Sequence, residues 1–216
     1  MPDRFERFSA LAGVGAVVLW VVGVALTGGD HVGLPGGVPE EGADETLAYF
    51  RENEGAVMGG SWIFMLGSLF FLWFAGILRS RLVRAEGGAG TFGSIAFAGA
   101  VATGILTLAM PTGGLVTVLG IDHVSAQTAH ALNAVESMFF IAAELAAIVL
   151  LVATAVVTVR AQAFPRWWAW ASILLAVWLV VGPIGWLGLL IGVPIWTLVT
   201  SAMLFGTQAP NAPRRA

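Results

Sequence analysis

Six polar side chains recur at helical spacing within an otherwise oily stretch of the chain. At about 100° per residue, they fall in one stripe about 120° wide. The stripe consists of His123, Gln127, His130, Asn133, Ser137 and Glu144. Imidazole, amide, hydroxyl and carboxyl groups together could bind a polar ligand, a cation or a proton. If the chain is helical throughout this stretch, the stripe predicts an outward-facing vestibule that ends at a carboxyl group.

Glu144 is the acidic residue that the sequence places most firmly inside an apolar span. It lies about 24 Å from Arg160 along a helix, in the outer half of a bilayer. One interpretation is a protonated carboxyl that bonds a neighbouring hydroxyl, such as Thr103 or Thr107, and fixes helix packing. Two other interpretations of Glu144 are a cation or proton site and a polar substrate pocket. Glu136 falls off the stripe, and we expect it near the outer surface, in contact with water.

The candidate metal ligands lie outside the apolar spans. His31, Asp122 and His123 could converge on a metal ion if the first and third spans end side by side, whereas the alternative is solvated loop residues. His123 and His130 are about 10 Å apart along a helix, too far to share one ion. The metal site is therefore left unassigned.

Motifs for catalysis are missing from the sequence. The chain has no cysteine, which excludes disulfides, thiolate catalysis and Cys-ligated metal centres. It has no nucleotide-binding loop, serine elbow or HExxH motif. We therefore predict no catalytic residue and no cofactor, and we favour a protein that is not an enzyme.

Composition indicates a polytopic membrane protein. Of 216 residues, 58% are hydrophobic and 11% are charged, whereas soluble domains carry about 25% charged residues. The formal net charge is −3, and no cluster of basic residues could neutralise a phosphate backbone, which argues against nucleic acid as a partner. The partners that we expect are the lipid bilayer and another membrane protein, bound through helix seams or through the acidic outer loop.

Apolar runs long enough to cross a bilayer, about 20 residues each, predict one all-α domain over residues 1–216. The six predicted spans are 8–27, 57–78, 91–113, 135–158, 167–182 and 186–206. The first span is longer than a signal-peptide core and ends in a poor cleavage site, Thr27-Gly28-Gly29, so we favour a retained helix. We expect breaks or bends at Pro111, at Gly182-Pro183-Ile184-Gly185 and at Pro194.

The positions of the arginines constrain the transmembrane topology independently. All of them except Arg51 precede the first span, follow the second or fourth span, or close the chain. Six spans place all these segments on one side, which the positive-inside rule makes cytoplasmic. The outer loop, residues 28–56, is acidic, and Asp44 could cap a short amphipathic helix with Leu47, Tyr49 and Phe50 on its apolar side. We expect that helix to lie on the outer membrane interface.

Small residues indicate how the spans pack. Ala96, Ala100 and Gly104 recur four residues apart in the third span, and Gly60 and Gly67 lie two turns apart in the second. In lipid, where little hydrophobic force acts between helices, such residues let two backbones approach closely. We therefore predict that both faces are close-packed seams.

A succession of segments carries a resemblance to a known kind of protein. An outer amphipathic segment (Thr46-Leu47-Ala48-Tyr49-Phe50-Arg51-Glu52-Asn53) precedes a helix that ends Phe71-Leu72-Trp73-Phe74-Ala75-Gly76-Ile77-Leu78-Arg79, and Phe164-Pro165-Arg166-Trp167-Trp168 opens the fifth span. This order resembles uncharacterised six-helix bacterial inner-membrane proteins of the domain-of-unknown-function type. The resemblance implies a multi-pass protein of the bacterial cytoplasmic membrane, and it implies no activity for any residue. Function is thus open between an accessory, assembly or sensing component and a small transporter or ligand-binding protein that uses the stripe ending at Glu144.

Overall fold

The computed structural model describes residues 9–27 and 42–207, with the side chains of 182–184 and 207 left out, and these residues form a bundle of helices. The helices are α2 (Ala12–Leu26), α3 (Ala43–Glu52), α4 (Glu54–Glu86), α5 (Thr91–Ala109), α6 (Thr112–Leu119), α7 (Ala126–Ala161), α8 (Arg166–Val180), α9 (Gly182–Leu187), η1 (Gly188–Gly192) and α10 (Val193–Thr207). Across these two ranges there is no β-strand. The predicted all-α fold is confirmed.

Four helical segments are long and apolar enough to cross a membrane. They are Glu54–Glu86, Thr91–Leu119, Ala126–Ala161 and Gly185–Gly206. The apolar helices α2 and α8 have 15 residues each, about 22 Å at 1.5 Å per residue, against a hydrocarbon core of about 30 Å. Six crossings therefore stay a prediction.

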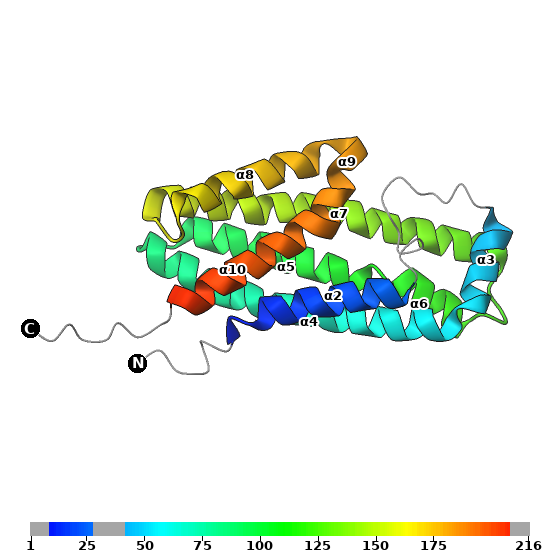
Figure 1. The fold of residues 1–216 in the computed structure, drawn as a ribbon. Coiled ribbons are helices and arrows are strands. Elements are labelled where there is room, and N and C mark those ends of the chain that lie inside the picture. The colour runs from blue at the N-terminus through cyan, green and yellow to red at the C-terminus, as the bar shows by residue number, and fades with distance from the viewer. Residues whose placement is uncertain (1–8, 28–41, 208–216) are drawn as a thin grey trace, which may run out of the picture.

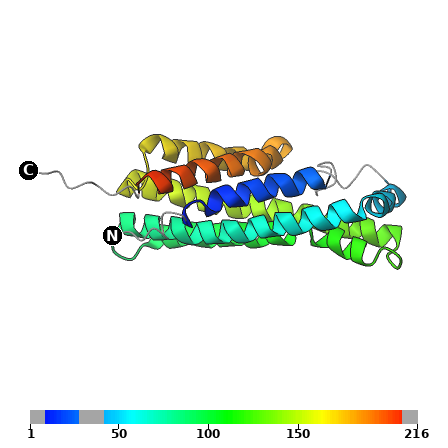
Figure 2. The ribbon, with the colours of Figure 1, turned by 60° about the horizontal axis from the view of Figure 1, so that its bottom comes forward.

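The two ends of the bundle differ in build. The turns α4–α5 and α7–α8 lie at one end of the bundle, where α2 begins and α10 ends (Figure 1). We call this the arginine end, because it carries Arg79, Arg81, Arg84, Arg160 and Arg166. Helices α4 and α7 extend about 50 and 54 Å from it. The α8–α9–α10 hairpin stops well short of the other, distal end (Figures 1 and 2).

The predicted breaks have clear local causes. Helix α5 ends at Ala109 and α6 begins at Thr112, with Pro111 between them. Helix α8 ends before the Gly182–Gly185 segment, as expected. Pro194 has no N–H to donate within α10, and the turn before it is π-helical, with the Val193 N–H bonded to the Gly188 carbonyl. Such irregular turns re-aim a helix.

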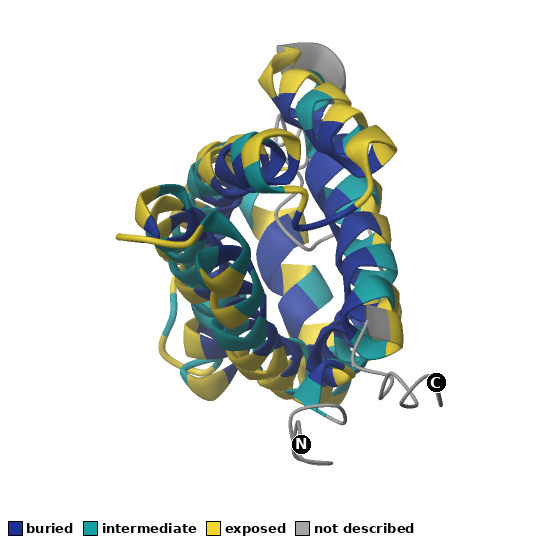
Figure 3. Cartoon of the chain, turned by 90° about the vertical axis from the view of Figure 1, so that its left-hand side faces the viewer, coloured by how far each residue is buried: buried dark blue, intermediate teal, exposed yellow. Residues whose placement is uncertain are grey.

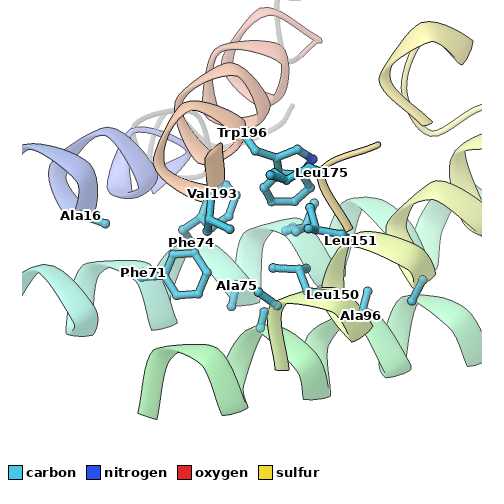
Figure 4. Close-up of a cluster of buried hydrophobic side chains, with 14 of the residues drawn as sticks. Ala16, Phe71, Phe74, Ala75, Ala96, Leu150, Leu151, Leu175, Val193 and Trp196 are labelled. Carbon is cyan, nitrogen blue, oxygen red and sulfur yellow. The ribbon is translucent and has the colours of Figure 1, made fainter. Parts of the chain in front are cut away.

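The core lies inside the helix ring near the arginine end. Buried residues face inward and exposed ones outward (Figure 3), and Phe71, Phe74 and Trp196 meet there (Figure 4). The seams are close, as predicted: a Cβ on Gly60 would lie 2.8 Å from the Gly23 carbonyl oxygen, and one on Gly99 would lie 2.5 Å from the Leu150 amide nitrogen. Ala96, Ala100 and Gly104 are all buried.

Helix α3 exists as predicted, but its apolar face packs on protein. Its N-cap is Gly42, not Asp44, and the Gly42 N–H donates to the Glu45 carboxylate at 3.0 Å. Leu47 packs with Ala126 and Ala129 of α7, and Phe50 packs with Val57 and Val118. Because α4, α6 and α7 extend to the distal end, α3 lies across them there (Figure 2). The apolar face of α3 thus packs on protein, and its expected position on the outer membrane interface stays a prediction.

Candidate functional site

The predicted polar stripe does not begin at His123. Helix α7 starts at Ala126, and its N-cap, Ser125, has extended backbone and accepts a hydrogen bond from the Thr128 N–H at 3.2 Å. His123 lies in the preceding turn and is exposed. The hypothesis of a helix running through this stretch is wrong before residue 126, because a serine that can cap a helix start lies inside it.

The part of the stripe near the distal end does not form an open vestibule. Gln127 is exposed. His130 is half-buried, and its Nδ1 lies 3.5 Å from the hydroxyl of Thr46 in α3. Helix α3 thus covers the face of α7 along which the vestibule was expected to open.

The remaining three stripe residues are buried. Asn133, Ser137 and Glu144 are 6%, 4% and 8% exposed. Asn133 Oδ1, Ser137 Oγ and Glu144 Oε1 each lack a hydrogen-bond partner. Buried polar atoms without partners are rare, so each calls for a structural or functional account.

Glu144 faces α9. A Cβ added to Gly185 would lie 3.6 Å from its Oε1. The two hydroxyls expected to bond it are committed elsewhere: Thr103 donates to the Gly99 carbonyl at 2.8 Å, and Thr107 donates to the Gly104 carbonyl at 3.0 Å. The expected hydroxyl partnership is therefore wrong, because each threonine bonds its own helix.

Glu136 is the carboxyl with a defined bonding role, and the prediction that it is in contact with water is wrong. It is 5% exposed, not wetted, and its Oε1 accepts a hydrogen bond from the Gly114 N–H at 2.7 Å. Gly114 lies in the first turn of α6, where backbone amides have no partner within their own helix. Glu136 of α7 therefore caps the start of α6. A Cβ on Gly113 would lie 2.5 Å from the Leu132 carbonyl oxygen, so glycine is needed for this approach. The sequence carries a signal for this contact: Pro111-Thr112-Gly113-Gly114 can start a helix, and the first amides of that helix need an acceptor.

A small cavity adjoins the Glu136 carboxyl. Its volume is about 30 Å³, room for a water-sized group. Thr27, Tyr49 and Ser61 line it together with apolar side chains. The Tyr49 hydroxyl donates to the Thr27 carbonyl, which ties α3 to the end of α2. The cavity thus places a few polar side chains at the edge of an apolar interior.

A larger, apolar cleft of about 500 Å³ lies beside it. Helices α2 and α10 meet at the arginine end, where Gly13 packs against Thr197 and Ser201, and they diverge toward the distal end (Figure 1). The cleft lies between the diverging parts, with Trp20 and Val21 on one wall and Leu190 and Pro194 on the other. The π-helical turn and Pro194 set the direction of that second wall.

The two cavities are neighbours. Val24, Phe64 and Met110 line both of them. Glu144 lines neither. The structure therefore brings together Glu136 and an apolar cleft, rather than Glu144 and a vestibule.

The candidate metal ligands are not brought together in the part of the chain that the structure describes. Asp122 and His123 are exposed in the turn before α7. His31 lies outside the described residues. Among described residues, no group of three or more His, Cys, Asp or Glu side chains could hold a metal ion.

Comparison of the chain with family models, with curated proteins and with solved structures finds no match. Its function is therefore argued from the site alone.

Proposed function

We propose that this chain is a non-enzymatic membrane protein, an accessory or sensing component, that binds a bilayer amphiphile between α2 and α10. The apolar body of the amphiphile occupies the cleft, and a small polar head such as a hydroxyl reaches the Glu136 carboxyl. The observation that carries the proposal is the shared wall of the two cavities, which sets one polar acceptor at the end of an apolar volume.

The dimensions and lining of the cleft support a lipid-like ligand. Ligand sites have volumes of about 300–1,000 Å³, with mostly apolar walls and a few polar groups that fix orientation; the cleft has about 500 Å³. Val21 and Ala25 of α2 are exposed on its rim, so a ligand can enter from the lipid side.

Met110 separates the cleft from the small cavity. It is 5% exposed and belongs to both walls. Methionine is unbranched and changes rotamer easily. We expect Met110 to move aside when the polar head reaches Glu136.

Photolabelling of the purified full chain in detergent tests the proposal. The probe is a diazirine analogue of a long-chain alcohol. We expect crosslinks at Trp20–Ala25 and Leu189–Pro194, and a severalfold loss of crosslinking in Thr107→Phe, which fills the cleft. Ile105→Phe, on the exposed face of the same helix, is the matched control and keeps labelling. Uniform labelling of all lipid-facing helices in both variants would contradict the proposal.

A second pair of variants tests the polar head. A diazirine alkane without the hydroxyl serves as the comparison probe. Wild type should prefer the alcohol, and Glu136→Met, which keeps length but removes the acceptor, should label equally with both probes. Glu144→Met changes a buried carboxyl that lines neither cavity, so it should keep the preference. Equal labelling by the two probes in wild type would remove Glu136 from the site.

For the setting, we propose six crossings of a bacterial cytoplasmic membrane with the arginine end inside, as in the six-helix family that the sequence resembles. The common end of the α4–α5 and α7–α8 turns supports it. The chain has no cysteine, so single cysteines can be labelled cleanly. Ala89→Cys and Ala216→Cys should react from the inner face, and Asp122→Cys from the outer face. Labelling of Ala89→Cys and Ala216→Cys from opposite faces would overturn the proposed six-span topology.

A proton or cation path along α7 is the second candidate. It is favoured by the unpartnered atoms of Asn133, Ser137 and Glu144, which follow one another down the same helix. In vesicles loaded with a pH-sensitive dye, this function predicts proton flux in wild type that is abolished in Glu144→Gln. The control is Glu136→Gln, which should conduct like wild type. Equal flux in wild type and Glu144→Gln would exclude the path.

A further inference from the structure

A third cavity lies at the arginine end, far from the cleft and from both buried carboxyls. Its volume is about 630 Å³, and it lies between the end of α4, the α7–α8 turn and the end of α10. Two guanidinium groups, Arg81 and Arg166, line it, together with apolar Phe164 and Met203. Among the described residues that line it, none is acidic.

Arg81 is held in place while keeping donors to spare. Its Nε and Nη2 donate to the Ala163 carbonyl oxygen at 3.3 and 3.0 Å. A guanidinium carries five N–H groups, so the contact with Ala163 leaves others available. The contact fixes the guanidinium at the cavity wall, which lowers the entropy cost of binding a further acceptor.

Arg166, at the first position of α8, carries a charge that no described acidic side chain along the cavity wall balances. Helix α8 has no acidic residue in its first turn, and a cation is disfavoured there by the helix dipole. Arg166 is exposed. An anion between Arg166 and Arg81 would offset both charges.

The other described charges at this end are already engaged. Arg79 lies over the Phe97 ring at 5.5 Å, and Arg160 lies over the Phe92 ring at 5.0 Å. Arg84 donates to the Ser80 carbonyl oxygen at 3.0 Å. The Glu86 carboxylate accepts from the amides of Phe92 and Gly93 at 3.0 and 2.9 Å. Of these four groups only Glu86 is acidic, and its carboxylate is already bonded to the two amides, so it does not neutralise the cavity.

We propose that this cavity binds the phosphate headgroup of an anionic phospholipid. The exposed indoles of Trp167 and Trp170 beside it are typical of the headgroup level of a bilayer, and basic pockets between membrane helices suit such headgroups. Phe164 and Met203 supply the apolar lining that an acyl chain would contact. This lining favours a lipid over free phosphate as the source of the anion.

Thermal unfolding of the full chain in a neutral detergent tests this site. The additives are phosphatidylglycerol, phosphatidylcholine and inorganic phosphate, each titrated separately. We expect saturable stabilisation by phosphatidylglycerol alone. Equal stabilisation by inorganic phosphate would overturn the lipid assignment, and equal stabilisation by phosphatidylcholine would overturn the anion site.

Two arginine variants locate the binding. Arg166→Gln should weaken phosphatidylglycerol binding about fivefold, as expected for one arginine near a membrane surface, with no loss of folding because Arg166 is exposed. Arg84→Gln removes an equal charge at the same end but outside the cavity, so it should leave affinity within about twofold of wild type. An equal effect of both variants would replace a defined site by diffuse surface attraction and overturn the proposal.

Discussion

The arginine half of the bundle and the distal half solve the same packing problem differently. In the arginine half, glycines and alanines let α2, α4, α5, α7 and α10 meet closely around an aromatic core. In the distal half, α8 and α10 have already ended or diverged, and α3 covers three longer helices instead (Figures 1 and 2). The arginine half has a closed interior, and its cavity lies outside that core at the end of the bundle, whereas the distal half carries the cleft and both buried glutamates.

The difference between the two halves shows where close packing is replaced by a cleft and by buried polar groups. Close packing gives each buried atom many weak contacts whose sum is large, and it leaves no volume for a ligand. The cleft exists because the π-helical turn and the start of α10 lie apart from α2, which α10 meets only farther along, at Thr197 and Ser201. Glu136 is buried because an extra helix start, that of α6, needs an acceptor. A ligand whose apolar body needs space inside the bundle therefore fits the half where packing is incomplete, whereas the headgroup site at the arginine end lies outside the packed core.

The largest expected effect comes from breaking a seam in the packed half. In Gly99→Val, the added Cβ would lie 2.5 Å from the Leu150 amide nitrogen and 3.1 Å from the Ala146 carbonyl oxygen. Both are backbone atoms, so α5 and α7 must separate. We expect a loss of about 3 kcal/mol, at the upper part of the usual range for overpacking, measured by chemical unfolding in detergent.

Gly76→Ala is the matched control for the seam. Nothing lies within 4 Å of a Cβ built there, and alanine favours the helix by about 0.5–1 kcal/mol over glycine. This variant should unfold no earlier than wild type. If Gly99→Val were as stable as Gly76→Ala, the close α5–α7 contact would not exist in the folded protein.

The next effect tests the bonded carboxyl of the distal half. Glu136→Ala removes the acceptor of the Gly114 N–H and leaves that amide buried without a partner. We expect a cost of about 1–3 kcal/mol, together with faster hydrogen exchange at the amides of α6. Unchanged exchange there would mean that Glu136 does not cap α6.

Sequence reasoning predicted local features of the helices more fully than the way in which neighbouring helices cover one another. Glycine spacing predicted the seams, and Pro111 and the Gly182–Gly185 segment predicted the breaks, because these signals act within a few residues of themselves. The position of α3 and the burial of Glu136 depend on how far neighbouring helices extend. Helical angles alone put Glu136 off the stripe and gave no sign that α6 lies against it.

A smaller effect tests a polar contact where the packed half borders the cleft, since Trp20 also forms a cleft wall. The Trp20 indole N–H donates to the Ser68 hydroxyl at 3.0 Å, and both residues are buried. A double-mutant cycle of Trp20→Phe and Ser68→Ala should give a coupling energy of about 0.6 kcal/mol, as for interhelical hydrogen bonds in membranes. A coupling energy near zero would mean that α2 and α4 are held by small-residue contact alone.

The smallest effect is expected at the second carboxyl of the distal half. Glu144 Oε1 has no hydrogen-bond partner, and an unpaired buried charge is costly, so we expect a neutral carboxyl that an amide of the same shape can replace. Glu144→Gln should unfold within about 0.5 kcal/mol of wild type, as measured by thermal midpoint in detergent. A large loss in this variant with none in Glu136→Gln would reverse the contrast between the two glutamates. Glu144 would then be bound to an ion or a proton donor that holds α7 to α9, and the polar stripe rather than the cleft would be the functional feature of the distal half.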